Sequence, residues 1–498
     1  MIIDDQFYDV IIVGTGAGGG TIARKLADAG KKILVLEQGE FTEKESSELV
    51  EDELFKKENY HAPEQWYDRE GEPFFPQAKY CVGGNTKIYS GALSRLREKD
   101  FEQVQHQEGI SPAWGLKYTD FESYYTEAEK LYQAHGKAGD DPTEPFRSEG
   151  FPLPPVARIP QITELGDRLT KHGLHPAYLP IGIGDEGRTD SEDTGVSPAI
   201  RAEKDITLKT SAKVVSLHTN PSGTEVKGVQ AEVNGQAYLF MAHIVVLSCG
   251  AINSAALLLR SANEKYPNGL ANSSDLVGRN LMKQLMTVIL QQSPKPNDGL
   301  FQRSMQINDF YWGDQDFPYP MGHIQDAGGL LQDVIFSESP PLLSIAAKLM
   351  PGFGLKKLAK NSVGWWLQTE DLPDPKNRVY LKGEKLHLDY TPNNLEAHDR
   401  LLYRWQETLK ATDKKSRGIH PYGATPIQVV AHQCGTCRFG EDPQSSVLDL
   451  DCRTHDLDNL YVVDSSFFPS SAAVSPILTV IANALRVGDK LIERLNSY

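Results

Sequence analysis

Cysteine is scarce in this chain of 498 residues. The five cysteines are scattered at positions 81, 249, 434, 437 and 452, an odd number without the spacing of a disulfide framework. Such usage excludes a small disulfide-stabilised secreted scaffold and suits a reducing cytoplasm. Cys434 and Cys437 form the only close pair and could be half of a redox or metal site with His432. No second pair completes it, so the pattern favours small buried thiols and no metal.

Positive charge and long apolar runs are lacking as well. Lys and Arg number 51 against 67 Asp and Glu, which gives a net charge of −16. This balance argues against nucleic acid and against anionic membrane surfaces as partners. No stretch approaches the ~18 apolar residues of a membrane span. The start, Met1 to Asp5, is acidic and lacks the basic region of a signal peptide. We therefore expect a cytoplasmic protein with no membrane span.

The first 40 residues carry a strand–turn–helix–strand pattern. The apolar run 10–13 predicts a buried parallel strand, and 32–36 predicts a second one. A helix is expected over about 17–29, ending near Gly30. Glycines in the spacing G-x-G-x-x-G lie between the first strand and this helix. In that context we interpret the motif as a dinucleotide-binding fingerprint rather than an ordinary glycine turn.

Each residue of the fingerprint has a separate expected role. Gly14 allows the tight turn, Gly16 lets the backbone approach a pyrophosphate, and Gly19 lets helix and strand pack closely. The helix N-terminus offers free N–H groups to the phosphates. Glu37 follows the second strand, where it can accept hydrogen bonds from ribose hydroxyls. FAD and NAD share this motif, whereas a glutamate here disfavours NADP because it would repel a 2′-phosphate.

The remaining sequence predicts a second domain inserted into the first. The chain is longer than one domain requires. Segment 206–240 alternates like strands, and 243–254 repeats the strand–glycine–helix order, with the helix expected over 255–262. Segments 363–370 and 377–390 are typical of antiparallel strands. We expect an α/β fold: a Rossmann-like domain formed by 1–100, 200–295 and 425–498, with an inserted mixed α+β substrate-binding domain formed by 101–199 and 296–424.

Two further stretches indicate chemistry. The pair Gly83-Gly84 suggests backbone passing close to a flat group such as a flavin ring; a plain glycine turn before a strand is equally compatible. Near the C-terminus, His432 precedes a glycine turn, and the strand at 460–463 ends at Asp464. An amphipathic helix is expected over 477–491 with Ser475 as N-cap and Pro476 as its first residue.

Together these motifs resemble the glucose-methanol-choline oxidoreductases, a flavoprotein family. Within the family the chain is most similar to bacterial sugar and glycoside oxidoreductases related to pyranose oxidase. The matching pieces span the chain: 14–19 with Glu37, 83–86, 245–254, 277–280, 432–436 and 464–489.

The resemblance implies FAD, with its pyrophosphate on the first glycine turn and its adenine near Val214. It places Gly84 to Tyr89 beside the isoalloxazine and Asp464 near the ribityl chain. Some relatives tether FAD through a histidine near the Gly-Gly pair; this chain has no histidine from 62 to 104, so we expect non-covalent FAD. The expected cofactor-binding residues are Gly14, Gly16, Gly19, Glu37, Gly83, Gly84, Asn85, Thr86, Val214, Asp464 and Pro476.

The family's catalytic histidine corresponds to His432, which suits a base that takes a hydroxyl proton as hydride leaves carbon for flavin N5. The second catalytic position, usually His or Asn, is Ser475 here. Serine offers one short hydroxyl, so it could position substrate or serve only as a cap.

We expect an FAD-dependent oxidoreductase acting on the CH–OH group of a sugar, glycoside or other alcohol. The alternatives are a non-redox flavoenzyme, such as a lyase or decarboxylase, and a flavoprotein subunit with diminished catalysis. The electron acceptor, whether oxygen, quinone or a redox protein, stays open.

Overall fold

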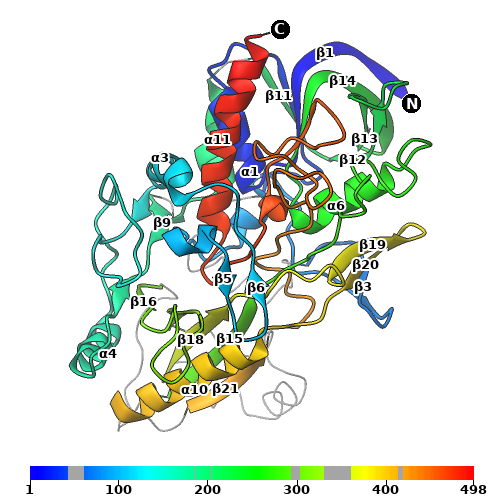
Figure 1. Ribbon diagram of the computed structural model, residues 1–498. Helices are drawn as coiled ribbons and strands as arrows, with labels where there is room; N and C mark the ends of the chain where they lie inside the picture. The colour runs from blue at the N-terminus through cyan, green and yellow to red at the C-terminus, as the bar shows by residue number, and fades with distance from the viewer. Residues whose placement is uncertain are drawn as a thin grey trace, which may run out of the picture.

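The computed structural model describes residues 1–42, 61–185, 187–202, 205–292, 303–329, 361–412, 419–424 and 426–497. Two large sheets organise these residues (Figure 1). The first has seven strands in the order β11-β2-β1-β14-β13-β12, with β22 paired to β14. Its strands are β1 (Ile2–Val13), β2 (Ile33–Leu36), β11 (Ile206–Lys209), β12 (Ala212–Thr219), β13 (Val226–Val233), β14 (Gln236–Leu247) and β22 (Leu460–Val462).

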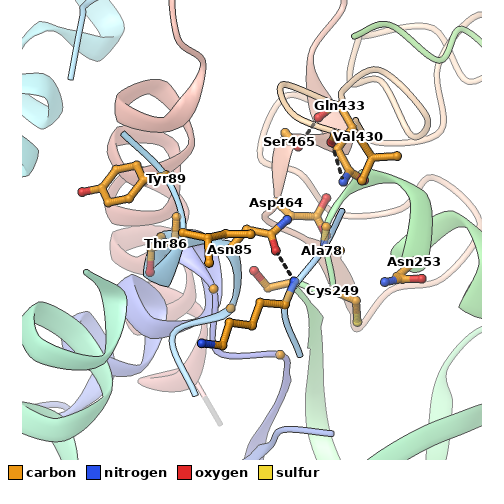
Figure 2. Close-up of a pocket in the computed structure, with 18 of the residues that line it drawn as sticks. Ala78, Asn85, Thr86, Tyr89, Cys249, Asn253, Val430, Gln433, Asp464 and Ser465 are labelled. Atoms are coloured by element: carbon orange, nitrogen blue, oxygen red, sulfur yellow. Dashed lines mark hydrogen bonds between the residues drawn. The ribbon is translucent and has the colours of Figure 1, made fainter. Parts of the chain in front are cut away.

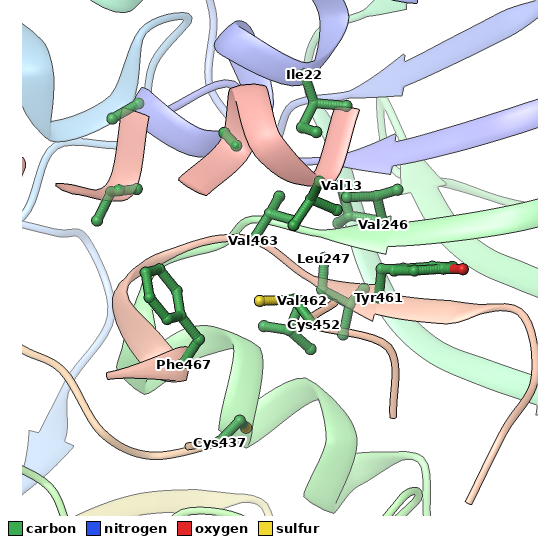
Figure 3. Packing of buried hydrophobic residues seen from close by; sticks show 14 of the residues in the cluster. Val13, Ile22, Val246, Leu247, Cys437, Cys452, Tyr461, Val462, Val463 and Phe467 are labelled. Carbon is green, nitrogen blue, oxygen red and sulfur yellow. The ribbon is translucent and has the colours of Figure 1, made fainter. Parts of the chain in front are cut away.

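The parallel half of this sheet forms the centre of the main core. Strands β11, β2, β1, β14 and β22 run parallel, whereas β12 and β13 are antiparallel. Residues 10–13, 33–36 and 244–247 are all at most 4 % exposed. Strands covered on both faces are apolar throughout rather than alternating, which explains why the short runs were recognisable in sequence. Val13, Val246 and Val462 pack together in this core (Figure 3).

Helices from distant parts of the chain pack beside the first sheet. The α1 helix (Ala17–Leu26) contacts α11 (Ile477–Leu495), and α11 contacts α3 (Tyr118–Leu131). The Tyr125 hydroxyl and Thr479 Oγ1 are 2.8 Å apart where α3 meets α11.

The helix after β14 is α6 (Ala251–Arg260). It begins four residues earlier than expected, because Gly250, with φ of 86°, turns the chain into a helix directly after the strand.

The second large sheet has six strands in the order β21-β15-β18-β17-β16-β8 and is antiparallel throughout. Helix α10 (Leu395–Thr412) packs on β15 and β18, with the rings of Trp365 and Trp405 4.7 Å apart in edge contact. The strands are β8 (Ala177–Tyr178), β15 (Leu285–Gln292), β16 (Met305–Ile307), β17 (His323–Gly329), β18 (Ser362–Thr369) and β21 (Ile419–Ala424). Strand β15 was expected in the Rossmann-like part; it belongs to this second sheet, because it pairs with β18 along its full length.

Smaller elements complete the fold. A four-stranded sheet joins β19 (Arg378–Lys382) and β20 (Lys385–Asp389) to β3 (Trp66–Tyr67) and β4 (Pro73–Phe74). The remaining elements are α4 (Pro160–Lys171), α5 (Ser197–Arg201), β5 (Val104–Gln105), β6 (Ile110–Ser111), β7 (Ala134–His135), β9 (Ile181–Gly184), β10 (Gly187–Arg188), the 3₁₀ turns 84–87, 98–101 and 465–467, and a π-helical turn at 192–196.

The glycine turn between β1 and α1 is held by contacts that leave no room for side chains at two positions. Gly14 has φ of +94°, and a Cβ there would lie 2.4 Å from the Ser248 carbonyl oxygen. A Cβ on Gly19 would lie 2.0 Å from the carbonyl oxygen of Gly14. Gly16 differs: no heavy atom of the described residues lies within 4 Å of its Cβ position. The turn thus packs tightly on its strand side and is open at Gly16.

These contacts predict that alanine at Gly19 impairs folding, whereas alanine at Gly16 impairs cofactor binding. Gly19→Ala forces a methyl group into a backbone carbonyl, and overpacking of this kind costs ~1–3 kcal/mol of folding free energy. Gly16→Ala should fold with a nearly unchanged melting temperature but bind FAD more weakly, because its methyl group occupies the open face of the turn. Thermal melts of the apoproteins and FAD titrations measure the two effects. Equal destabilisation by both substitutions would contradict this assignment.

Candidate active site

A cavity of about 450 Å³ opens at the carboxyl ends of the parallel strands. In open α/β sheets ligands bind outside the carboxyl ends of the strands, where this cavity lies. Its wall continues to the six-stranded sheet through Met286 on β15 and Gln368 on β18. The cavity therefore joins the dinucleotide-binding turn to the second sheet.

Most residues singled out from sequence line this cavity. The lining includes Gly14, Gly16, Glu37, Gly84, Asn85, Thr86, Val214, His432, Asp464, Ser475 and Pro476. Gly19 and Gly83 are not among the lining residues. Gly19 packs behind the turn, and the Gly83 N–H donates to Thr15 Oγ1 at 3.0 Å. These two glycines support the wall instead of facing a ligand.

The nucleotide end of the cavity carries a carboxylate held in place by its neighbours. Glu37 Oε2 accepts hydrogen bonds from the Thr15 N–H at 3.0 Å and the Thr15 hydroxyl at 2.6 Å, and Oε1 accepts from the Gly39 N–H. Burial raises the pKa of Glu37, while these hydrogen bonds oppose the rise. These contacts hold the Glu37 carboxylate at the cavity wall directly after the second parallel strand.

A second buried carboxylate stands where β22 ends. Asp464 accepts from the Gly250 N–H at 3.0 Å, the Ser466 N–H at 2.9 Å and the hydroxyls of Ser254 and Ser466. Burial raises its pKa, and the hydrogen bonds from both serines oppose this. Asp464 and Asn85 are drawn as neighbouring lining residues in the centre of Figure 2. It is positioned by the strand end and the N-terminus of α6 together.

The Gly-Gly segment does not lead into a strand. Gly83 has φ of 92°, and residues 84–87 form a 3₁₀ turn, so the alternative of a glycine turn leading into a strand is wrong. Asn85 Oδ1 accepts the Lys79 N–H at 2.8 Å, which ties the turn to the adjacent segment (Figure 2). Lys87 forms ion pairs with Asp190 and Glu192 at 2.8 and 2.7 Å. The turn thus presents backbone and Asn85 to the cavity while its lysine is held elsewhere.

These features fit FAD. The open face at Gly16 accommodates phosphates beside the N-terminus of α1. Two anchored carboxylates, Glu37 and Asp464, line the cavity where a ribose and a ribityl chain are expected. Bound FAD would be held by this turn, these carboxylates and the segment 84–86.

His432 lines the same cavity and contacts Gln368 of the second sheet. Its backbone has φ of 55°, a left-handed conformation that few non-glycine residues adopt. Its Nδ1 lies 2.7 Å from Gln284 Oε1 and 3.4 Å from Gln368 Nε2. Burial, together with the charge of Arg303, lowers the pKa of His432 to about 4. The imidazole is therefore neutral at neutral pH and can accept a proton.

Ser475 lies at the cavity wall, but it does not cap the helix as expected. Helix α11 begins at Ile477, and Pro476, with φ −77° and ψ −12°, is its N-cap residue without a side-chain cap bond. The N-cap is therefore Pro476, one residue later than the sequence predicted. The Ser475 hydroxyl makes no hydrogen bond to any other described residue, and Ser475 remains 9 % exposed. Its hydroxyl is available to a ligand.

Sequence reasoning missed several lining residues near His432. These are Met286, Arg303, Trp366 and Gln368, which come from β15, β18 and the segment before β16. They belong to no recognisable motif, because only the pairing of the second sheet brings them beside His432.

The cysteine expectation is confirmed. All five cysteines are free, and Cys434 and Cys437 are buried thiols whose pKa values burial raises. Within the described ranges no group of three or more His, Cys, Asp or Glu could hold a metal ion. Those ranges also contain no helix that is both long and apolar enough to cross a membrane.

Known proteins resemble this chain over nearly its whole length. The GMC oxidoreductase family models match residues 8–286 and 373–484. The 6'''-hydroxyparomomycin C oxidase of Streptomyces lividus is 29% identical, covering 99% of this chain and 92% of its own. The paromamine 6'-oxidase of Streptomyces fradiae is 27% identical over 97% and 91%. The fructose dehydrogenase large subunit of Gluconobacter japonicus is 26% identical over 98% of both.

Solved structures share the fold. Pyridoxine 4-oxidase from Mesorbium loti superposes with a TM-score of 0.71 at 20% identity, covering 97% of this chain and 99% of that one. A variant of Aspergillus oryzae formate oxidase gives 0.73 at 15% identity, covering 99% of both chains. With the glycine turn, the carboxylates and the histidine facing one cavity, the chain belongs to the GMC oxidoreductase family and is an FAD-dependent oxidoreductase acting on CH–OH groups.

Proposed function

We propose that this protein oxidises a CH–OH group of a sugar, glycoside or other alcohol, with His432 as the base that takes the hydroxyl proton. The observation that carries the proposal is the position of His432 on the wall of the cavity, beside residues that fit FAD. Bound FAD supplies the acceptor for the hydride that leaves the alcohol carbon. Histidine is the side chain that most often acts as a general base, and burial favours the neutral, proton-accepting form of this imidazole.

The residues around His432 support a polyhydroxylated substrate. Trp366 offers an aromatic face and Gln368 an amide that can both donate and accept hydrogen bonds. The relatives named above act on aminoglycosides or, in the case of fructose dehydrogenase, on a sugar. They include oxidases as well as a dehydrogenase, so the electron acceptor is left open among oxygen, a quinone and a redox protein.

We keep the two-domain division as part of the proposal, with β15 moved to the substrate-binding part and the other boundaries as expected from sequence. Five free cysteines suit a reducing compartment, so we propose a cytoplasmic location.

A lyase, or a subunit with diminished catalysis, stays the alternative because Ser475 replaces the usual Asn or His.

Substitution of His432 tests the proposed base. We expect His432→Ala to retain FAD and fold while the rate of flavin reduction falls by ~10²–10⁴-fold, the usual contribution of a general base. Rapid mixing under anaerobic conditions measures this rate with the best alcohol found. His455→Ala is the matched control, because His455 bonds Ser446 outside the cavity and its loss should leave the rate unchanged. Normal reduction by the His432 variant would exclude it as the base.

The cofactor should be bound without a covalent link. The chain has no histidine from 62 to 104, and Lys87, in the Gly-Gly segment, is engaged by Asp190 and Glu192. Acid precipitation of the purified protein should therefore release the yellow colour into the supernatant. Flavin that stays in the pellet and migrates with a peptide after proteolysis would contradict this.

Ser475 should matter for the substrate and not for folding. Because its hydroxyl makes no cap bond, Ser475→Ala should change the melting temperature little, unlike a true cap, whose loss costs ~1 kcal/mol. Ser475→Asn restores the longer donor and acceptor of its relatives and should raise the rate of flavin reduction with simple alcohols. Melting curves and reduction kinetics on both variants measure this. Unchanged rates for both would remove Ser475 from the catalytic site.

A further inference from the structure

Three distant chain segments meet behind His432 at one side chain. Gln284, the residue directly before β15, is 2 % exposed. Its Oε1 lies 2.7 Å from His432 Nδ1. Its Nε2 lies 3.1, 2.9 and 2.8 Å from the carbonyl oxygens of Ser471, Ala472 and Val474, respectively. One amide therefore contacts the histidine on one side and the segment leading to Ser475 on the other.

The three carbonyl contacts fix which way this amide faces. Carbonyl oxygens accept hydrogen bonds only, so the NH₂ group of Gln284 must point at residues 471–474. Turning the amide over would place Oε1 against three oxygens and leave a buried donor without acceptors, at the cost of several hydrogen bonds. Gln284 Oε1 must then face His432, and an amide oxygen can only accept. The hydrogen in the 2.7 Å contact belongs to Nδ1 of His432.

A competing contact is too long to change this assignment. Gln368 Nε2 lies 3.4 Å from the same Nδ1, whereas its own Oε1 accepts from Gln325 Nε2 at 3.2 Å. A donor at 3.4 Å makes at best a weak hydrogen bond, and the contact at 2.7 Å is close to optimal. A neutral imidazole protonated at Nδ1 has its lone pair on Nε2, the nitrogen that would serve as base.

Backbone strain is concentrated at the same place. Gln284, His432 and Ala472 have φ of 62°, 55° and 49°. Left-handed conformations at non-glycine residues persist only where the surrounding structure over-determines them, and they cluster at functional sites. Asp371 provides part of that constraint: its carboxylate accepts the N–H groups of Lys283 and Gln284 at 3.0 and 2.8 Å.

We propose that Gln284 is a positioning residue for the reaction: it holds His432 in the Nδ1–H form, with Nε2 free to take the substrate proton, and fixes the segment that carries Ser475. This inference rests on the proposed role of His432 as base. It adds that the two catalytic candidates, from different parts of the chain, are aligned by one buried amide.

Two substitutions in the holoenzyme separate positioning from a purely structural role. Gln284→Met fills the space but removes both contacts, so the rate of flavin reduction per bound FAD should fall by ~10- to 100-fold while the half-saturating alcohol concentration changes little. Gln284→Glu, buried against three carbonyl oxygens, should stay protonated. Its O–H then donates to the segment 471–474 while its C=O still accepts from His432 Nδ1, so this conservative variant should keep more of the reduction rate than Gln284→Met.

Tyr390→Phe is the matched structural control. It removes a hydrogen bond to Asp371 in the same network, at 2.8 Å, without touching Gln284 or His432. It should alter stability but leave the rate of flavin reduction in place. A wild-type reduction rate in Gln284→Met, a rate in Gln284→Glu as low as that in Gln284→Met, or loss of FAD from both variants would overturn the proposal. If instead His432→Ala itself reduces flavin normally, the proposed function fails, and it does so independently of Gln284.

Discussion

The close approach of α1 to the ends of three strands is the constraint on which the rest of this structure depends. Carbonyl oxygens of Gly14, Ser248 and Val463 occupy positions that any side chain on residues 19, 14 and 18, respectively, would need. These contacts bring the helix N-terminus to the edge where β1, β14 and β22 end. The residue after Val463 is Asp464, so the same packing that opens a phosphate site also places the second carboxylate of the cavity.

The catalytic end is built on a different principle. His432 and Ser475 come from loops, and loops are positioned accurately only when buried polar contacts hold them. Here Gln284 contacts both loops, and Asp371 holds the backbone of Gln284 in place. A fully satisfied buried network of this kind is rigid, because losing one partner leaves another polar group unpaired. The nucleotide end thus depends on close backbone packing, and the substrate end on a hydrogen-bond network.

This difference explains what could be predicted from the sequence. The roles of Gly14 and Gly19 follow from a local pattern, and the strands at 10–13 and 33–36 from their apolar runs. His432 was found through a short motif beside a glycine turn. Contacts of Gln284 with residues more than 140 positions away leave no local signal. Pairing of β15 in the second sheet is likewise a long-range property, which the apolar run alone does not reveal.

The Ser475 cap was wrong for a more local reason. Serine before proline is a good sequence signal for a helix start, yet the helix begins at Ile477 with Pro476 as its N-cap residue, and helix ends are the least predictable part of an element. The shift changes the interpretation of Ser475, whose hydroxyl is left for a ligand instead of the backbone. Small errors at helix ends therefore matter most where a helix N-terminus borders an active site.

In this cavity an alcohol should lose a hydride from its carbon and a proton from its hydroxyl group. The most direct test is an anaerobic titration of the holoenzyme with a panel of sugars, glycosides and simple alcohols, followed by absorbance of the flavin and by product analysis. The account predicts bleaching of the flavin by at least one of these alcohols, with the matching carbonyl product in equal amount, and recovery of colour with a suitable acceptor. Product formed without net flavin reduction, or no reaction with any alcohol in the panel, would contradict it.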